Sequence, residues 1–142
     1  MPNYHFDRLF NPQEAEELIP ALEVLVRELQ VNATEFRRAL AEVLKRDPGA
    51  EAHELPAIIA RYPQLRPLSS GLAELTHKIE SFGCLLKDID QGLIDFPFEL
   101  DDGEVVFLCW QFGEPRIVAW HPVDGGFAQR KPLPGAAKPL LN

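Results

Sequence analysis

Three aspartates lie close together in the middle of the chain and could bind a cation. Asp88 and Asp90 are two residues apart, and Asp95 follows five residues later. Carboxylates at this spacing can share a divalent metal ion when the backbone points both to one side. Alternatively, Asp88 and Asp90 end a helix and start a turn, and Asp95 lies on the solvent face of a strand. The residues alone leave both interpretations open.

His121 is the second candidate, because an imidazole can bind a metal ion or transfer protons near neutral pH. It falls at the end of a predicted strand, where site residues are common. With Asp95, Glu114 or Asp124 it would form a histidine–carboxylate site. His121, Asp95 and Glu114 are therefore the possible ligands of a divalent metal. The alternative is a histidine that only hydrogen-bonds to backbone at the strand end.

Arg130 and the aromatic residues could bind an anion or a flat ligand. Arg130 follows Gly125-Gly126-Phe127, and these glycines allow close backbone approach. Its guanidinium could hold a carboxylate or phosphate through two hydrogen bonds, with Trp110 as a pocket wall. Such a protein would sense a small ligand. Alternatively, Arg130 pairs with Glu114 or Asp124 to fix the loop, and Trp110 belongs to the core.

The composition restricts partners and location. The net charge of −8 disfavours nucleic acid, whose phosphates require a basic face. Cys84 and Cys109 lack the spacing of common zinc sites, and their apolar neighbours predict buried, reduced thiols. We find no apolar run of membrane-spanning length and no apolar core of a signal peptide. We therefore expect a cytoplasmic protein without a membrane partner.

A long helix is predicted over about residues 12–46. Asn11-Pro12-Gln13-Glu14 combines a capping side chain, a proline at the first helical position and an acid that completes a capping box. Asp47-Pro48-Gly49 ends the helix. Pro20 lies inside it and predicts either a kink or a break into two helices.

A second helix is predicted over about residues 65–86, where apolar side chains alternate every third and fourth position in a narrow seam. The two helices should form a long antiparallel hairpin over about 11–87. Residues 48–64 connect them, with a short helix near 56–61. The first helix has three apolar columns, which is wider than one narrow seam can cover.

This mismatch predicts a second copy of the chain. An uncovered apolar column would forfeit about 1.5–3 kcal/mol for each large side chain. A homodimer with four packed helices would cover it. Asn32, which is polar within an apolar column, would then fix the register. The alternative is that Asn32 is a partly exposed helix residue.

The C-terminal half predicts a small three-stranded antiparallel sheet over about 91–121. Short strands are expected at 92–96, 105–110 and 116–121, separated by the turns Asp101-Asp102-Gly103 and Gly113-Glu114-Pro115. The strand at 105–110 is apolar on both faces, so we expect it to be central and covered on both sides.

The predicted fold class is therefore α+β. Residues 1–133 should form one domain, in which a closing loop at 122–133 follows the helical hairpin and the sheet. Residues 134–142 are rich in proline, glycine and alanine, and we expect them to form a flexible tail.

Three blocks of the sequence resemble a known prokaryotic family. They are FDRLFNPQEAEELIP, GCLLKDIDQGLIDFP and VFLCWQFGEPRIVAWHPVDGGFAQRKPL. Together they resemble the family catalogued as domain of unknown function 2203. The closing block, with its W-x-x-G-E, W-H and G-F-x-x-R-x-P-L elements, is the most specific. The resemblance implies a bacterial cytoplasmic protein, and it implies no activity, substrate or catalytic residue.

The sequence favours a non-enzymatic binding or scaffolding module that forms a helical-bundle homodimer and acts through its sheet. The alternative is a metal-dependent enzyme, possibly a hydrolase, that uses His121 with acidic residues of the 88–114 segment. Candidate ligand-binding residues are Asp88, Asp90, Asp95, Trp110, Glu114, His121 and Arg130. A divalent metal is the possible cofactor.

Overall fold

The long first helix forms as predicted. The computed structural model describes residues 5–133, and its first element, α1, spans Pro12–Arg46. Asn11 accepts a hydrogen bond from the backbone N–H of Glu14, and the Glu14 carboxylate accepts one from the N–H of Asn11. This capping box satisfies two N–H groups that would otherwise lack partners. The helix continues through Pro20, so the chain does not break into two helices there.

The second predicted helix is shorter than expected. Two 3-10 turns, η1 (Pro48–Ala52) and η2 (Pro63–Leu65), flank a short helix, α2 (Leu55–Arg61), and α3 then spans Arg66–Glu80. The helix ends there because Gly83 takes a left-handed φ of +99° and turns the chain. Leu85 and Leu86 continue the apolar spacing of α3, yet they belong to a strand.

The sheet has five strands, and the prediction of three was therefore wrong. The strands are β1 (Leu85–Asp88), β2 (Leu93–Glu99), β3 (Val105–Gln111), β4 (Ala119–Pro122) and β5 (Lys131–Pro132). They follow one another across the sheet in chain order, and every pair is antiparallel. A third 3-10 turn, η3 (Phe127–Gln129), lies between β4 and β5. The α+β class is confirmed.

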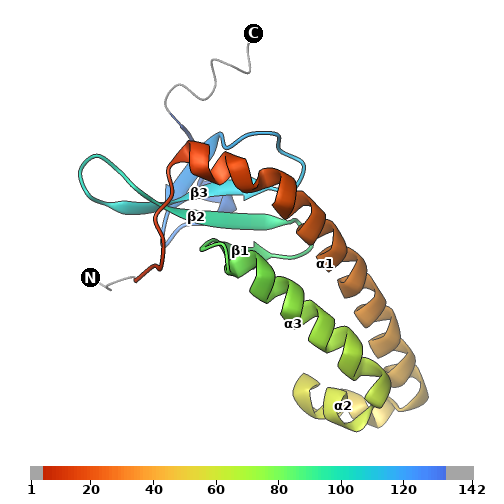
Figure 1. Cartoon of the computed structure of the whole chain (residues 1–142). Coiled ribbons are helices and arrows are strands. Elements are labelled where there is room, and N and C mark those ends of the chain that lie inside the picture. The colour runs from red at the N-terminus through yellow and green to blue at the C-terminus, as the bar shows by residue number, and fades with distance from the viewer. Residues whose placement is uncertain (1–4, 134–142) are drawn as a thin grey trace.

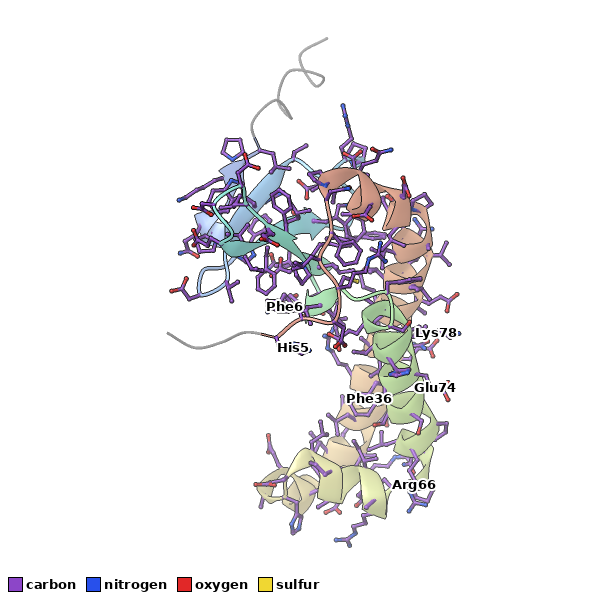
Figure 2. The ribbon with its side chains drawn as sticks, turned by 60° about the vertical axis from the view of Figure 1, so that its left-hand side comes forward. His5, Phe6, Phe36, Arg66, Glu74 and Lys78 are labelled. Atoms are coloured by element: carbon purple, nitrogen blue, oxygen red, sulfur yellow. The ribbon has the colours of Figure 1, made fainter. Side chains whose placement is uncertain are left out.

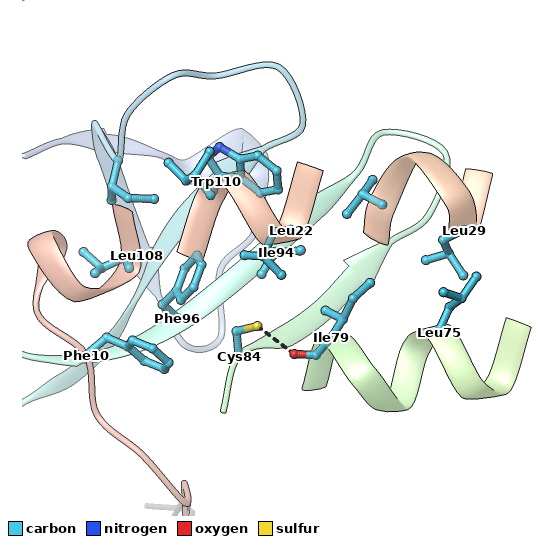
Figure 3. Close-up of a cluster of buried hydrophobic side chains, with 14 of the residues drawn as sticks. Phe10, Leu22, Leu29, Leu75, Ile79, Cys84, Ile94, Phe96, Leu108 and Trp110 are labelled. Atoms are coloured by element: carbon cyan, nitrogen blue, oxygen red, sulfur yellow. Dashed lines mark hydrogen bonds between the residues drawn. The ribbon is translucent and has the colours of Figure 1, made fainter. Parts of the chain in front are cut away.

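The main core lies between one face of the sheet and the helices. Figure 1 shows the first half of α1 crossing the sheet, with α3 beside it. Ile94, Phe96, Leu108 and Trp110 from β2 and β3 meet side chains of α1 and α3, which Figure 3 shows in detail. Cys84 lies in this core and donates a hydrogen bond from its Sγ to the carbonyl oxygen of Ile79, 3.2 Å away.

The far halves of α1 and α3 form an arm that extends away from the sheet and ends at α2 (Figure 1). A second buried cluster stabilises it, made of Phe36, Val43, Ile58 and Leu65. Figure 2 shows Phe36 on α1, and Arg66, Glu74 and Lys78 along α3.

The three apolar columns of α1 are covered within one chain. Their members are buried or partly buried against the two clusters. The sheet, α3 and the segment around α2 together cover the apolar side chains of α1. No apolar column of α1 is therefore left uncovered in the way that the sequence predicted. Asn32 lies beside α3, with its Nδ2 3.5 Å from where a Cβ on Gly71 would be.

The β1–β2 turn is held tightly between β3 and α1. Gly92 has a φ of +65°, and a Cβ there would lie 2.4 Å from the Cβ of Phe112 and 3.3 Å from Val26. Only glycine fits such a position without strain. The Gly92 carbonyl also accepts a hydrogen bond from the N–H of Phe112. The turn therefore fixes β1 and β2 relative to α1.

Candidate functional site

The face of the sheet that is turned away from α1 buries three side chains that can ionise or bind a metal. Asp95 on β2 lies opposite Cys109 on β3, and His121 on β4 lies opposite Phe107 on β3. Successive side chains of a strand alternate between faces, so Asp95, Cys109 and His121 share the face turned away from α1. Each is almost fully buried. Their ligand atoms all lie within 4.8 Å of one another.

His121 is held at both ring nitrogens. Its Nε2 lies 3.1 Å from both carboxylate oxygens of Asp95. Its Nδ1 lies 2.8 Å from the carbonyl oxygen of Pro122, which also accepts a hydrogen bond from the N–H of Gly125 at 2.9 Å. The loop after β4 and the imidazole therefore share one carbonyl group.

These contacts determine which ring nitrogen of His121 carries the hydrogen of the neutral imidazole. A carbonyl oxygen can only accept, so Nδ1 carries a hydrogen and donates it to Pro122. A neutral imidazole then turns the Nε2 lone pair towards the Asp95 carboxylate, and two lone pairs repel each other. A proton between His121 and Asp95 removes that repulsion, and a metal cation can take the place of the proton.

Burial controls the acid–base properties of the cluster. Loss of hydration raises the pKa of the Asp95 carboxyl, while the charge and hydrogen bonds of His121 and the charge of Lys87 counteract part of that rise. Burial also raises the pKa of the Cys109 thiol to about 12, and the neighbouring Asp95 carboxylate adds to this shift. Without a metal, Cys109 is therefore a neutral thiol at physiological pH.

A small cavity of about 100 Å³ opens beside the three side chains. Lys87 and Leu93 line it from the first two strands, and Gly125, Gly126 and Phe127 line it from the closing loop. The Lys87 ammonium lies 4.8 Å from the centre of the Phe107 ring, and that ring packs edge-on against His121. Because Asp95, Cys109 and His121 also line the cavity, it leaves space directly beside their side chains.

Asp88 and Asp90 take no part in this cluster. The Asp88 carboxylate accepts a hydrogen bond from the N–H of Gln91 in the β1–β2 turn. The Asp90 carboxylate forms an ion pair with Arg37 of α1 at 2.6 Å. The structure therefore separates the two neighbouring aspartates from Asp95 and gives them contacts that fix the turn.

Glu114 and Arg130 form a second polar contact. The Arg130 guanidinium donates to both carboxylate oxygens of Glu114, at 2.9 and 3.0 Å, and lies 4.8 Å from the Phe127 ring centre. Of the alternatives for Arg130, the structure shows the ion pair with Glu114. Trp110 is fully buried, and its indole N–H donates to the Glu114 carbonyl oxygen at 2.8 Å.

Cys109 is the member of the cluster that the sequence analysis did not place in a site. The two predicted turns hold the missing signal. A turn centred on residue 102 pairs positions that add up to 204, which places Cys109 opposite Asp95. A turn centred on 114 pairs positions that add up to 228, which brings His121 opposite Phe107. Combining these registers would have brought the three residues together.

The chain belongs to the family described as an uncharacterized conserved protein (DUF2203), whose model matches residues 8–133. This confirms the resemblance of its three sequence blocks. No curated protein and no solved structure matches the chain. Within residues 5–133, the helices lack the combination of length and apolar character that a membrane crossing needs.

Proposed function

We propose that the protein binds a divalent transition-metal ion, with zinc as the best match, through Asp95, Cys109 and His121. The observation that carries this proposal is the convergence of a carboxylate, a thiol and an imidazole within 4.8 Å on one buried face of the sheet. Nitrogen and sulfur donors with one oxygen suit zinc, whereas magnesium and calcium require oxygen ligands.

The distances fit a zinc ion after small movements. Zinc–ligand bonds of about 2.0–2.3 Å place neighbouring donor atoms of a tetrahedron about 3.3–3.8 Å apart. The His121–Asp95 distance is 3.1 Å, and the widest separation in the cluster stays within 4.8 Å. The Pro122 carbonyl holds the His121 ring so that Nε2 faces the cluster, as in sites where a hydrogen bond orients a metal-binding imidazole.

The geometry favours binding over catalysis. The cavity of about 100 Å³ is smaller than the roughly 300–1,000 Å³ of pockets that hold typical small molecules. It can hold a water molecule or a small anion as the fourth ligand of the metal. Cys109 is a poor nucleophile before metal binding, because its pKa of about 12 leaves the thiol protonated. We therefore favour a metal-binding module over a hydrolase.

The test is the zinc content of purified chain after dialysis against a zinc-buffered solution, with copurified metal removed beforehand. We expect one zinc ion for each chain. Cys109→Ser and His121→Gln should lose it, and Cys84→Ala should keep it, because Cys84 lies in the other core. Binding should also release the thiol proton of Cys109, which calorimetry in two buffers measures. Equal zinc content in all variants would refute the proposal.

We also infer that the protein works in a reducing compartment such as the cytoplasm. Cys84 and Cys109 are both free and buried. Free thiols persist in reducing compartments, whereas secreted proteins commonly pair them. Fractionation of cells that express the tagged protein tests this, and recovery with the exported proteins would overturn it.

A further inference from the structure

A stripe of exposed residues runs along the side of α1 that faces neither the sheet nor α3. Its members recur every third or fourth position, which is the spacing of a helix–helix contact. Val24 and Val31 lie at its centre, seven residues apart, and each is 53% exposed. Large side chains of this kind are normally buried when they repeat along one helix face. The stripe consists of Glu17, Ala21, Val24, Arg27, Glu28, Val31, Thr34 and Arg38.

A shallow hollow marks the middle of this stripe. It is lined by Val24, Arg27, Glu28, Val31 and Asn32. The two valines form its apolar part, and Arg27 and Glu28 lie between them. A surface of this composition suits an apolar side chain flanked by charges of both signs.

None of the four charged members of the stripe forms an ion pair with another residue of the range 5–133 that the structure describes. Within residues 5–133, ion pairs form at other positions, and Glu17, Arg27, Glu28 and Arg38 occur in none of them. Arg27 lies 5.7 Å from the Phe112 ring centre. Arg27 is also exposed, so its hydrogen-bond donors can reach a partner.

The order of these residues is self-complementary. In an antiparallel pair of identical helices related by a two-fold axis between residues 27 and 28, facing residues have numbers that add up to 55. This register sets Val24 against Val31, Arg27 against Glu28 and Glu17 against Arg38 of the second copy. Each pair occurs twice because the axis repeats it. The smaller Ala21 and Thr34 face each other between the charged and apolar pairs.

Other arrangements of the same stripe lose this match. A parallel pair sets each residue against its own copy, so Glu17, Arg27, Glu28 and Arg38 would each face a like charge, which is unfavourable. An antiparallel shift by seven residues sets a valine against Glu17 or Arg38. The charges and the two valines therefore select one register.

We infer that two copies of this chain associate through this stripe of α1 in an antiparallel arrangement with Arg27 facing Glu28. The stripe from 17 to 38 covers about 32 Å of helix at 1.5 Å per residue. A contact of that length between two helices is at the small end of stable interfaces. The dimer is therefore reversible at micromolar concentrations.

Sedimentation equilibrium over micromolar concentrations tests the inference. We expect a monomer–dimer equilibrium for the wild type. Arg27→Glu and Glu28→Arg should each raise the dissociation constant about tenfold, because two attractive pairs become repulsive. The double variant R27E/E28R should restore dimerisation, since the exchanged charges face each other again. Lys78, which Figure 2 shows on α3, does not belong to the stripe, so the same charge change in Lys78→Glu should have no effect.

Cysteine pairing tests the register separately from affinity. Chains carrying Val24→Cys and Val31→Cys should form disulfides on mild oxidation when they are mixed, and far fewer when each is oxidised alone. A monomer at every concentration, a failed rescue by R27E/E28R, or efficient crosslinking of Val24→Cys alone would overturn the inference. Circular dichroism checks that every variant remains folded.

Discussion

The two faces of the sheet are covered in different ways. On the face towards α1, Phe96, Leu108 and Trp110 pack into a continuous apolar core with both long helices. On the other face, Asp95 and His121 are buried beneath a short loop. The first face gains stability from buried apolar area. The second buries ionisable groups, which costs free energy unless they are paired.

If the proposed metal site is correct, this difference separates stability from metal binding within one sheet. Replacement of a buried ionic pair by apolar side chains of similar volume often leaves stability unchanged or raises it. The second face nevertheless holds a carboxylate, a thiol and an imidazole with a cavity beside them. Because burial of these groups costs free energy, their presence here supports the proposal of metal binding.

The largest predicted effect concerns the apolar face. Trp110→Ala should lower the free energy of unfolding by about 3–5 kcal/mol, because a fully buried indole leaves a cavity. Urea denaturation followed by circular dichroism measures this. Phe127→Ala, an aromatic change on the exposed loop over the other face, should cost much less. Similar costs for both variants would contradict the division between the faces.

The second prediction concerns the buried pair. In the presence of a chelator, His121→Leu should cost about 2–3 kcal/mol of unfolding free energy, because it leaves the buried Asp95 without its hydrogen-bond donor. The double variant Asp95→Leu/His121→Leu should cost less than His121→Leu alone. Urea denaturation of both variants gives the comparison. A double variant that costs as much as His121→Leu alone, or more, would mean that the pair behaves as ordinary packing.

The third prediction concerns the ion pair that fixes the closing loop. Arg130→Met should cost about 1 kcal/mol of unfolding free energy, because its pair with Glu114 is only 18% and 24% exposed. Arg116→Met is the matched control. Its pair with Glu16 is 43% and 31% exposed, so solvent screens it and the change should be near zero in the same urea measurement. A larger loss for Arg116→Met would reverse this assignment.

The smallest effect concerns the reactivity of the two thiols. Burial raises the pKa of both Cys84 and Cys109 to about 12, so both should react slowly with a thiol reagent at neutral pH, and the rate should rise with pH as thiolate forms. Cys109 borders the cavity and should react faster than Cys84. Labelling of Cys84→Ala and Cys109→Ala measures each thiol alone. A faster reaction at Cys84 would contradict the position of the cavity on the face of the sheet that holds Cys109.

Patterns of neighbouring residues predicted the elements whose ends and burial depend on those residues. The capping residues and the terminating Asp47-Pro48-Gly49 located α1, and the apolar pattern on both faces identified β3 as central and covered. The end of α3 was missed, because Leu85 and Leu86 keep a helical spacing within a strand. β5 was missed, because two residues that include a proline carry no strand pattern.

The site was only partly predictable, because it depends on register between strands. Asp95 and His121 were named as possible ligands, yet Glu114 carried equal weight. The contact of Glu114 with Arg130 spans 16 residues and leaves no periodic signal. The sequence predicts Cys109 as an ordinary buried thiol, because Asp95 and His121 are distant from it in the sequence. Strand pairing brings such residues together, and only the combined registers of the two predicted turns would have revealed it.

X-ray absorption at the zinc edge tests the central claim most directly. We predict a zinc ion with one sulfur ligand at about 2.3 Å and nitrogen or oxygen ligands at about 2.0–2.2 Å. Cys84→Ala should retain the sulfur contribution, and Cys109→Ser should lose it. A spectrum without sulfur in the wild type, or one that Cys109→Ser leaves unchanged, would contradict the assignment of the metal to the Asp95–Cys109–His121 face.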